Sequence, residues 1–317
     1  MLLIVDSESE GQRLDNFLVK KIRNIPKSRI YRMVRKGEVR LNSGRAKPCR
    51  KLTLGDKVRV PSLAGLEIKV KHVPEDLATR LNKKINEVSI IADKPDFFVI
   101  NKPINIASHG VNRDNLGLLE LTRRLYPSLN LQLVHRLDKA TSGLIIVSKK
   151  RSSLVAFHNL LRNGEIKKKY LAVCVSKRKN ISIPREVSKP LRRTLDKNGN
   201  RYVVVDNDGQ FALTKVRLLK VEKESSLGHR YLLECIPITG RTHQLRAHLL
   251  SIGLPIFGDK RYYEERSSSF FKQLFPNRLY LHAWKLSFRN PVNGNWEDFE
   301  APVPDAFKKI FNSALKL

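Results

Sequence analysis

HRLDKATSGL, at residues 135–144, is the stretch that says most about how this chain folds. Leu133 and Val134 precede it and an apolar run through Val147 follows, so its polar residues lie between two segments that must be buried. An Asp in such a turn is usually a turn former or a cap. On local context alone, Asp138 is therefore either a structural residue or a catalytic carboxylate.

Outward from this stretch, short apolar runs alternate with amphipathic segments over most of the chain. Strands are predicted at residues 88–92, 97–100, 144–148, 170–175 and 231–236, and helices at residues 118–125, 154–161 and 242–250. The sequence Asp206-Asn207-Asp208-Gly209, between β-branched and apolar residues, predicts the turn of a hairpin. Such alternation predicts an α+β domain.

Length and charge predict a two-domain protein that binds a polyanion. A chain of 317 residues exceeds the usual size of one domain, and 41% hydrophobic residues can fill a substantial core. The 61 Lys and Arg against 30 Asp and Glu give a formal net charge of +31, which attracts nucleic acid or a membrane surface. The apolar start is followed at once by Asp6, Glu8 and Glu10, which fits neither a signal peptide nor an anchor. We therefore expect a nucleic-acid partner, no membrane contact and a cytoplasmic location.

Cysteine and histidine spacing predicts no metal site. Cys49, Cys174 and Cys235 are odd in number and far apart, so we expect reduced, structural thiols. His243 and His248 are five residues apart, which misses the i, i+4 spacing of a helical zinc site.

Residues 12–61 hold 16 Lys and Arg against 3 Asp and Glu, so much of the excess charge lies in this short segment. Leu14, Phe17, Leu18 and Ile22 recur at helical spacing and predict a first helix. The segment is therefore expected to fold as a separate basic module.

A second helix is predicted after the break at Pro26, with Ser28 as its N-terminal cap and Gly37 at its C-terminal cap. Its buried face is formed by Ile30, Met33 and Val34. Its other face carries three basic residues, which are expected to contact RNA: Arg29, Arg32 and Lys36.

This N-terminal pattern resembles the S4 RNA-binding domain. The residues that carry the resemblance are Arg13-Leu14-Asp15-x-x-Leu18, Gly37, Val39-x-Leu41-Asn42 and Gly55-Asp56-Lys57-Val58. The resemblance implies a small α/β RNA-binding domain over residues 1–75, a linker over residues 76–87 and a larger domain over residues 88–317. The alternative is an ordinary solvated basic face on a small domain.

A second polar string, TGRTHQLRAH at residues 239–248, follows a predicted strand. Gly240 breaks that strand, and a helix is predicted to start at Thr242. Arg241, His243 and the free N–H groups of the helix start suit phosphate binding. The alternative is a basic helix with His243 held in the core.

The order of these motifs resembles the pseudouridine synthase family of the type that modifies large-subunit ribosomal RNA. The matching residues are Asn101-Lys102-Pro103, His109-Gly110, residues 135–144, Lys169-Tyr170-Leu171-Ala172, residues 239–246 and Gly253-x-Pro255-Ile256-x-Gly258-Asp259. The resemblance implies a catalytic domain built on a mixed, largely antiparallel sheet. Two departures lie in one loop, where Asn105 stands in place of the usual Gly and Ser108 in place of an aliphatic residue.

The family resemblance also implies roles for individual residues. Asp138 would be the catalytic carboxylate, acting either as a nucleophile or as a base, and Arg246 would orient it. Tyr170 would stack on the uracil and Leu245 would pack against Tyr170, although an ordinary strand aromatic is the alternative for Tyr170. Substrate and product are isomers, so no cofactor is expected.

RNA contacts are implied for several further residues. A uridine held in a stack must flip out before its base can turn, and Arg136 would enter the gap that it leaves. His135 would contact RNA or simply support the loop. Lys102 and His109 complete the expected RNA-binding set.

The expected partner is 23S ribosomal RNA in an unassembled or partly assembled large subunit, bound by a monomer. Two other functions stay open on sequence alone. The first is a pseudouridine synthase that acts on transfer RNA. The second is a non-catalytic RNA-binding or ribosome-assembly protein, for which the charge and the S4-like segment would suffice.

Overall fold

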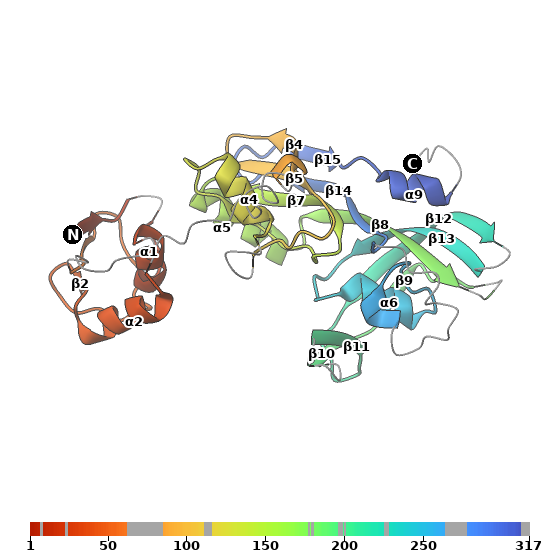
Figure 1. The fold of residues 1–317 in the computed structure, drawn as a ribbon, viewed down its shortest axis with the longest axis horizontal. Coiled ribbons are helices and arrows are strands. Elements are labelled where there is room, and N and C mark those ends of the chain that lie inside the picture. Colours follow the sequence, from red (N-terminus) through yellow and green to blue (C-terminus); the bar gives the residue numbers. More distant parts are fainter. Residues whose placement is uncertain are drawn as a thin grey trace, which may run out of the picture. The chain divides into compact units, whose positions relative to one another are not determined.

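A computed structural model describes residues 1–6, 9–22, 25–61, 85–110, 116–176, 178, 181–195, 199, 201–224, 228–263 and 278–311. The chain divides into two compact units, Met1–Ala78 and Thr79–Leu317, drawn in Figure 1. The predicted linker, residues 76–87, lies mostly outside the described residues, so its bounds stay a prediction.

The N-terminal unit packs two helices against a small sheet. Its elements are β1 (Leu2–Ile4), α1 (Leu14–Lys21), α2 (Lys27–Lys36), β2 (Arg40–Leu41) and β3 (Lys57–Arg59). The sheet is antiparallel, in the order β1-β3-β2. Leu14, Phe17 and Leu18 are buried against α2, as the helical spacing predicts.

Helix α2 has its predicted end but not its predicted cap. Pro26 occupies the N-cap, so Ser28 lies inside the first turn and the cap prediction is wrong. At the other end Gly37 has a φ of 75° and its N–H donates to the carbonyls of Met33 and Val34. Such a left-handed ending suits glycine, which has no Cβ to clash.

The second unit is built on one large sheet. Its strands are β4 (Ser89–Asp93), β5 (Phe97–Lys102), β6 (Gln132–Leu133), β7 (Ser142–Ser148), β8 (Lys167–Ser176), β9 (Glu186–Ser188), β12 (Leu213–Glu224), β13 (Gly228–Pro237), β14 (Leu281–Arg289) and β15 (Trp296–Glu300). Their order is β4-β5-β7-β14-β8-β13-β12-β9, with β15 beside β14 and β6 beside β7. Among the described pairs only β7 and β14 run parallel. The sheet is therefore mixed and largely antiparallel, as the resemblance implies.

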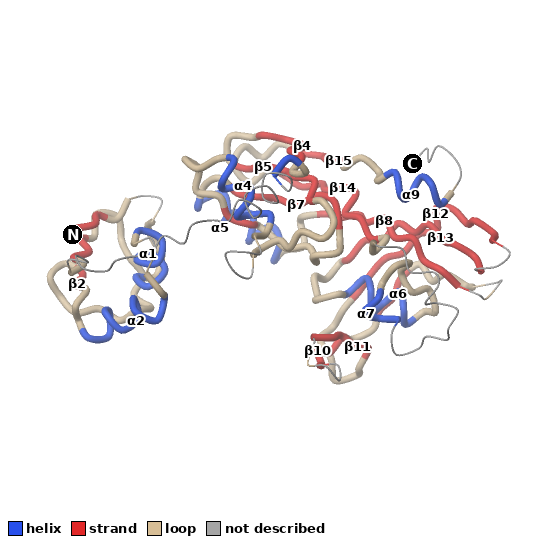
Figure 2. Tube along the Cα trace, in the orientation of Figure 1, coloured by secondary structure: helices blue, strands red, loops and turns tan. Residues whose placement is uncertain are grey.

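Helices flank the sheet in two groups. Those of this unit are α4 (Leu118–Leu125), α5 (Arg151–Arg162), α6 (Gln244–Ser251), α7 (Lys260–Tyr263) and α9 (Asp305–Ile310). Figure 2 shows α4 and α5 at the β4–β7 end and α6 near the β12–β13 end. Two apolar clusters follow this division, one around Phe97 and Phe157 and one around Leu232 and Leu249.

The hairpin predicted at residues 206–209 is only partly correct. The turn exists, because the Gly209 N–H donates to the Asp206 carbonyl at 2.9 Å. The strand before it, β11 (Arg201–Val205), pairs with β10 (Leu191–Leu195), whereas β12 pairs with β9 and β13. The turn therefore follows the β10–β11 hairpin. It connects β11 to β12, and these two strands do not pair with each other.

Backbones approach closely where β7 begins. Gly143 pairs with Ala283 of β14 and has a φ of 109°. A Cβ at this position would lie 2.1 Å from the Ala283 carbonyl oxygen. Only glycine fits, and the loop that carries Asp138 is held against β14 by this contact.

Among the described residues, no helix is both long and apolar enough to span a membrane.

Candidate functional site

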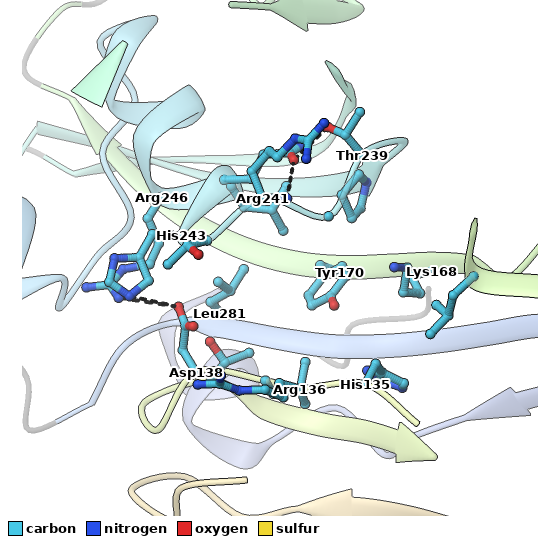
Figure 3. A pocket seen from close by; sticks show the side chains of 18 of the residues that line it. His135, Arg136, Asp138, Lys168, Tyr170, Thr239, Arg241, His243, Arg246 and Leu281 are labelled. Carbon is cyan, nitrogen blue, oxygen red and sulfur yellow. Dashed lines mark hydrogen bonds and ion pairs between the residues drawn. The ribbon is translucent and has the colours of Figure 1, made fainter. Parts of the chain in front are cut away.

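A cleft of about 920 Å³ opens over the centre of the sheet in the second unit. Its walls come from the loop before β7, from strands β8 and β14, and from the turn between β13 and α6. Both polar strings of the sequence, residues 135–144 and 239–248, therefore contribute to one cavity. Figure 3 shows Asp138 facing Arg246 and His243, with Tyr170 farther along the cleft.

The Asp138 loop is held in place by two hydrogen bonds between the Ser108 side chain and the backbone of Leu137. Ser108 Oγ donates to the Leu137 carbonyl at 2.7 Å and accepts the Leu137 N–H at 3.0 Å. Asn105, the other departure from the family pattern, has a φ of 61°, a conformation that Asn tolerates better than most residues. The two departures are thus compatible with the loop, and Ser108 adds contacts that an aliphatic side chain could not make.

Arg246 connects Asp138 to a buried carboxylate. Its guanidinium donates through Nε to Asp259 Oδ2 at 2.8 Å and through Nη2 to Asp259 Oδ1 at 2.7 Å. The remaining Nη1 lies 3.4 Å from Asp138 Oδ2. The Arg246 side chain is 8% exposed and Asp259 1%, against 31% for Asp138. The bidentate pair therefore fixes the guanidinium and leaves Asp138 open to the cleft.

Electrostatics keep this arginine charged. Burial lowers the pKa of Arg246, but hydrogen bonds to Asp259 and the charges of Asp259 and Asp138 outweigh burial and raise that pKa above its usual range. Asp259 was quoted in a motif of the sequence but given no role there. A carboxylate beside Gly258 offers no sign, in one sequence, of which distant arginine it holds.

His243 belongs to this centre more than to the RNA-binding surface. It is the N-cap of α6, with a φ of 50°, so the helix starts two residues later than predicted. Its Nδ1 is 3.1 Å from the Tyr262 hydroxyl and its Nε2 is 3.7 Å from Asp138 Oδ2. Burial lowers the pKa of His243 to about 4 against the opposing charge of Asp138. The ring is therefore neutral near pH 7.

Tyr170 and Leu245 line the cleft together, and both pack in the same apolar cluster. Burial first, and then the charge of Asp138, raise the pKa of the Tyr170 phenol well above its usual range. Tyr170 is thus a neutral ring in the wall of the cleft.

The prediction that Lys102 contacts RNA is wrong. Its side chain is fully buried, and its Nζ donates to the carbonyls of Pro103 at 2.9 Å, Ile106 at 2.8 Å and Lys139 at 3.3 Å. Burial lowers the pKa of Lys102 to about 7, against the charge of Asp138. This lysine joins the loop after β5 to the Asp138 loop.

His135 fits the supporting role that the sequence left open. Its Nε2 accepts the Ile146 N–H at 3.2 Å. Burial, and then the charge of Lys168, lower the pKa of His135 to about 3, so the ring is neutral. A neutral His135 ring carries no positive charge that would attract an RNA phosphate.

The other predicted RNA-binding residues are distributed over both units. Arg136, Arg241 and His109 line the same cleft, and each is exposed there. The basic residues of α2 belong to the N-terminal unit, where Arg32 and Lys36 are exposed and Arg29 is half-buried. Within the described part of the chain, no group of His, Cys, Asp or Glu could hold a metal ion.

Two family models match the chain, and they fall on different units. The model described as RNA pseudouridylate synthase matches residues 96–251, and the S4 domain model matches residues 12–58. Ribosomal large subunit pseudouridine synthase C from Buchnera aphidicola subsp. Acyrthosiphon pisum is 37% identical, over 99% of this chain and 97% of that relative. This chain belongs to the RNA pseudouridylate synthase family.

Other relatives and solved structures agree with that membership. The protein of the same name from Escherichia coli O157:H7 is 38% identical over 97% of this chain and 94% of its own. The structure of human RNA pseudouridylate synthase domain containing 4 has a TM-score of 0.57 at 24% identity, covering 74% of this chain and 97% of its own. At that identity the likeness shows a shared fold.

Proposed function

We propose that this enzyme converts specific uridines of 23S, large-subunit ribosomal RNA to pseudouridine, with Asp138 as its catalytic carboxylate. The observation that carries the proposal is the arrangement of Asp138 in the cleft. It faces a guanidinium that is itself fixed by the buried Asp259, and a neutral aromatic ring lies farther along the same cavity.

The reaction breaks the N1–C1′ glycosidic bond, turns the uracil and joins C5 to C1′. The proton on C5 is lost and N1 gains one, so substrate and product are isomers. Asp138 either attacks the ribose or removes a ribose proton, and its partly exposed position suits contact with the sugar in both routes. Arg246 holds the carboxylate in one orientation, which a planar, bidentate side chain does better than a lysine.

The uracil must be held while it is detached. We infer that it stacks on Tyr170, whose ring stays a neutral phenol and is supported by Leu245. Glycosidases admit water to such a site, whereas water here would divert the sugar to hydrolysis. The apolar packing behind Tyr170 keeps that wall of the cleft dry.

The target base has to leave its stack to reach this cleft, at a cost of a few kcal/mol. Arg136 is exposed, lies two residues before Asp138 and lines the cleft mouth, so we assign it to the vacated position in the RNA. Arg241 and His109 would contact neighbouring phosphates.

We infer a ribosomal RNA substrate because the relatives are named as pseudouridine synthases of the large ribosomal subunit. The S4 domain supports it, because a basic module separate from the cleft can bind RNA beyond the target base. We expect the enzyme to act as a monomer in the cytoplasm. A transfer RNA substrate is the second candidate. The cleft is expected to contact only the target uridine and its neighbours, and both kinds of RNA contain uridines.

Replacing Asp138 with Asn tests the assignment. Asn has nearly the same shape but no charge, so isomerisation should fall below detection while folding and RNA affinity remain within about twofold of wild type. The measurement is pseudouridine in large-subunit RNA after a single turnover with excess enzyme, beside a transfer RNA substrate. Asp298→Asn, at an exposed strand residue outside the cleft lining, is the matched control.

Wild-type turnover by the Asp138→Asn variant would remove Asp138 from the mechanism. A wild-type enzyme that modifies only transfer RNA would overturn the substrate and leave the chemistry in place.

A further inference from the structure

Three consecutive lysines at the start of β8 have different surroundings. Lys169 Nζ lies 3.6 Å from Glu234 Oε2, and Lys167 Nζ lies 5.4 Å from the centre of the Trp296 ring. Lys168 has no ion pair, hydrogen bond or ring contact of its side chain within the described part of the chain. Among the described residues, Lys168 is therefore the lysine of the three whose charge has no partner.

Lys168 shares the cleft with Tyr170. Residues i and i+2 of a strand point to the same face and are about 6.6 Å apart along it. Both residues line the cavity, and in Figure 3 Lys168 lies beside Tyr170, on the side away from Asp138. Lys169 points to the opposite face, where Glu234 is.

The position of Lys168 is costly for a cation. Burial lowers its pKa, and no opposing charge contributes. The nearby His135 is a neutral ring whose Nε2 already accepts the Ile146 N–H, so it gives the ammonium no acceptor. A desolvated cation without a partner in a substrate cleft is complementary to negative charge that arrives with, or develops on, the substrate.

Two parts of the RNA could bring that negative charge, a phosphate or the uracil itself. Arg136 and Arg241 are exposed and line the cleft, so they are better placed than Lys168 to meet phosphates, which remain hydrated. Lys168 is half-buried beside the ring that is expected to support the uracil, on the side opposite the ribose end at Asp138. That position faces the far edge of the base, which carries carbonyl oxygens.

We propose that Lys168 is a further catalytic residue, whose ammonium donates a hydrogen bond to a uracil carbonyl oxygen and stabilises the charge that forms there when the base is detached. The proposal rests on the proposed function. Heterolysis of N1–C1′ leaves the bonding electron pair on the uracil, where it is delocalised from N1 onto O2 and O4. The charge is neutralised when the electron pair forms the C5–C1′ bond; the C5 proton is then lost and N1 gains one, so Lys168 gives up no proton.

The test compares Lys168→Met with its neighbour Lys169→Met. Removing one preorganised donor to a developing anion costs about 100-fold in rate or more. We expect the single-turnover rate of Lys168→Met at saturating enzyme to fall about 100-fold, with RNA affinity unchanged within about twofold. Lys169→Met should react at the wild-type rate. Lys168→Arg, which keeps the charge, should recover part of the loss.

Thermal unfolding separates this role from a structural one. Met fills a similar volume without a charge, so Lys168→Met should unfold at the same or a higher temperature than wild type. A large fall in unfolding temperature together with the loss of rate would assign Lys168 to the fold instead.

A substrate with a better leaving group makes the test specific. Fluorine at C5 of the target uridine withdraws electrons from the detached base, so less stabilisation by Lys168 is needed. The readout is loss of the N-glycoside, because the fluorine prevents the final loss of a C5 proton. The rate ratio of wild type to Lys168→Met should shrink from about 100 to below about 10.

Two results would overturn the proposal. An unchanged rate with a salt dependence of RNA affinity flatter by about 0.7 in log K per log salt would make Lys168 a phosphate contact. An equal rate loss on uridine and 5-fluorouridine would show that Lys168 does not act on the leaving base. Absence of pseudouridine with the wild-type enzyme would instead refute the proposed function, so the two failures are distinguishable.

Discussion

The basic face of α2 and the Asp138 cleft both depend on positive charge, in opposite ways. Arg32 and Lys36 are exposed, and no ion pair engages them within the described residues. Arg246 is buried and held by two hydrogen bonds to one carboxylate. An exposed charge attracts RNA at long range and is screened by salt, whereas a fixed, buried one acts on a single atom and is screened little. We therefore expect basic residues to supply RNA affinity in one unit and to orient a carboxylate in the other.

The largest effect is expected from Arg246→Lys. Lysine keeps a charge but cannot hold Asp259 through two parallel hydrogen bonds while reaching Asp138. Turnover should fall about 100-fold, and RNA affinity by less than about threefold. Single-turnover rates and equilibrium binding measure the two effects separately. The control is Arg217→Lys, because Arg217 pairs with Glu234 outside the cleft lining.

Equal losses of rate and affinity in Arg246→Lys would erase the distinction between the two regions. Arg246 would then be a phosphate contact like those predicted on α2.

A smaller effect, on binding alone, is expected from the triple variant Arg29→Gln, Arg32→Gln and Lys36→Gln. If each residue neutralises one phosphate of unpaired RNA, the slope of log K against log salt should flatten by about 2, at about 0.7 per contact. The rate at saturating enzyme should not change. Lys308→Gln in α9, where Lys308 pairs with Asp305, is the control for the loss of a surface charge. A salt slope identical to wild type would leave the α2 face as a solvated surface.

The smallest effect is a difference in pH dependence between the two units. Burial lowers the folded-state pKa of His135 to about 3 and of His243 to about 4, below the usual 6.5. The unfolded chain therefore binds protons that the folded unit refuses, and the second unit should lose stability as pH falls from about 6.5 towards 4. Residues 1–61, which include the whole described part of the N-terminal unit, contain no histidine, so this contribution is absent from them.

The measurement is thermal unfolding across that pH range. One histidine contributes a slope of at most about 1.4 kcal/mol per pH unit, or a few degrees of unfolding temperature. His135→Gln should flatten the pH dependence of the second unit by that amount. An unfolding temperature that stays constant from pH 7 to pH 4.5 would contradict the assigned neutral histidines.

Local patterns were sufficient to predict much of the fold. The helical spacing of Leu14, Phe17 and Leu18 and the glycine at residue 37 place α1 and the end of α2 correctly, because these features act within a few residues. The cap prediction for Ser28 failed because the helix begins at Lys27, directly after Pro26, which places Ser28 inside the first turn. The hairpin at residues 206–209 was only partly correct, because β11 pairs with the preceding strand β10 and leaves the turn between two strands that do not pair with each other.

The site was predictable where a motif names its residues and unpredictable where partners are distant. Asp138, Arg246, Tyr170 and Leu245 do meet in one cleft. Lys102 was expected from the family resemblance to contact RNA, yet it is buried and donates to carbonyls of two loops. No feature of the residues beside Asp259 reveals that it holds an arginine thirteen positions earlier.

The contact between Gly143 and Ala283 joins two segments that are synthesised at very different times. The Asp138 loop lies in the first half of the chain, but the strand that holds it, Leu281–Arg289, is among the last segments to be made. A nascent chain has therefore produced Asp138 long before it can hold the Asp138 loop in place. The N-terminal unit lies within the first 78 residues, so all of it has been synthesised before the strand that completes the cleft.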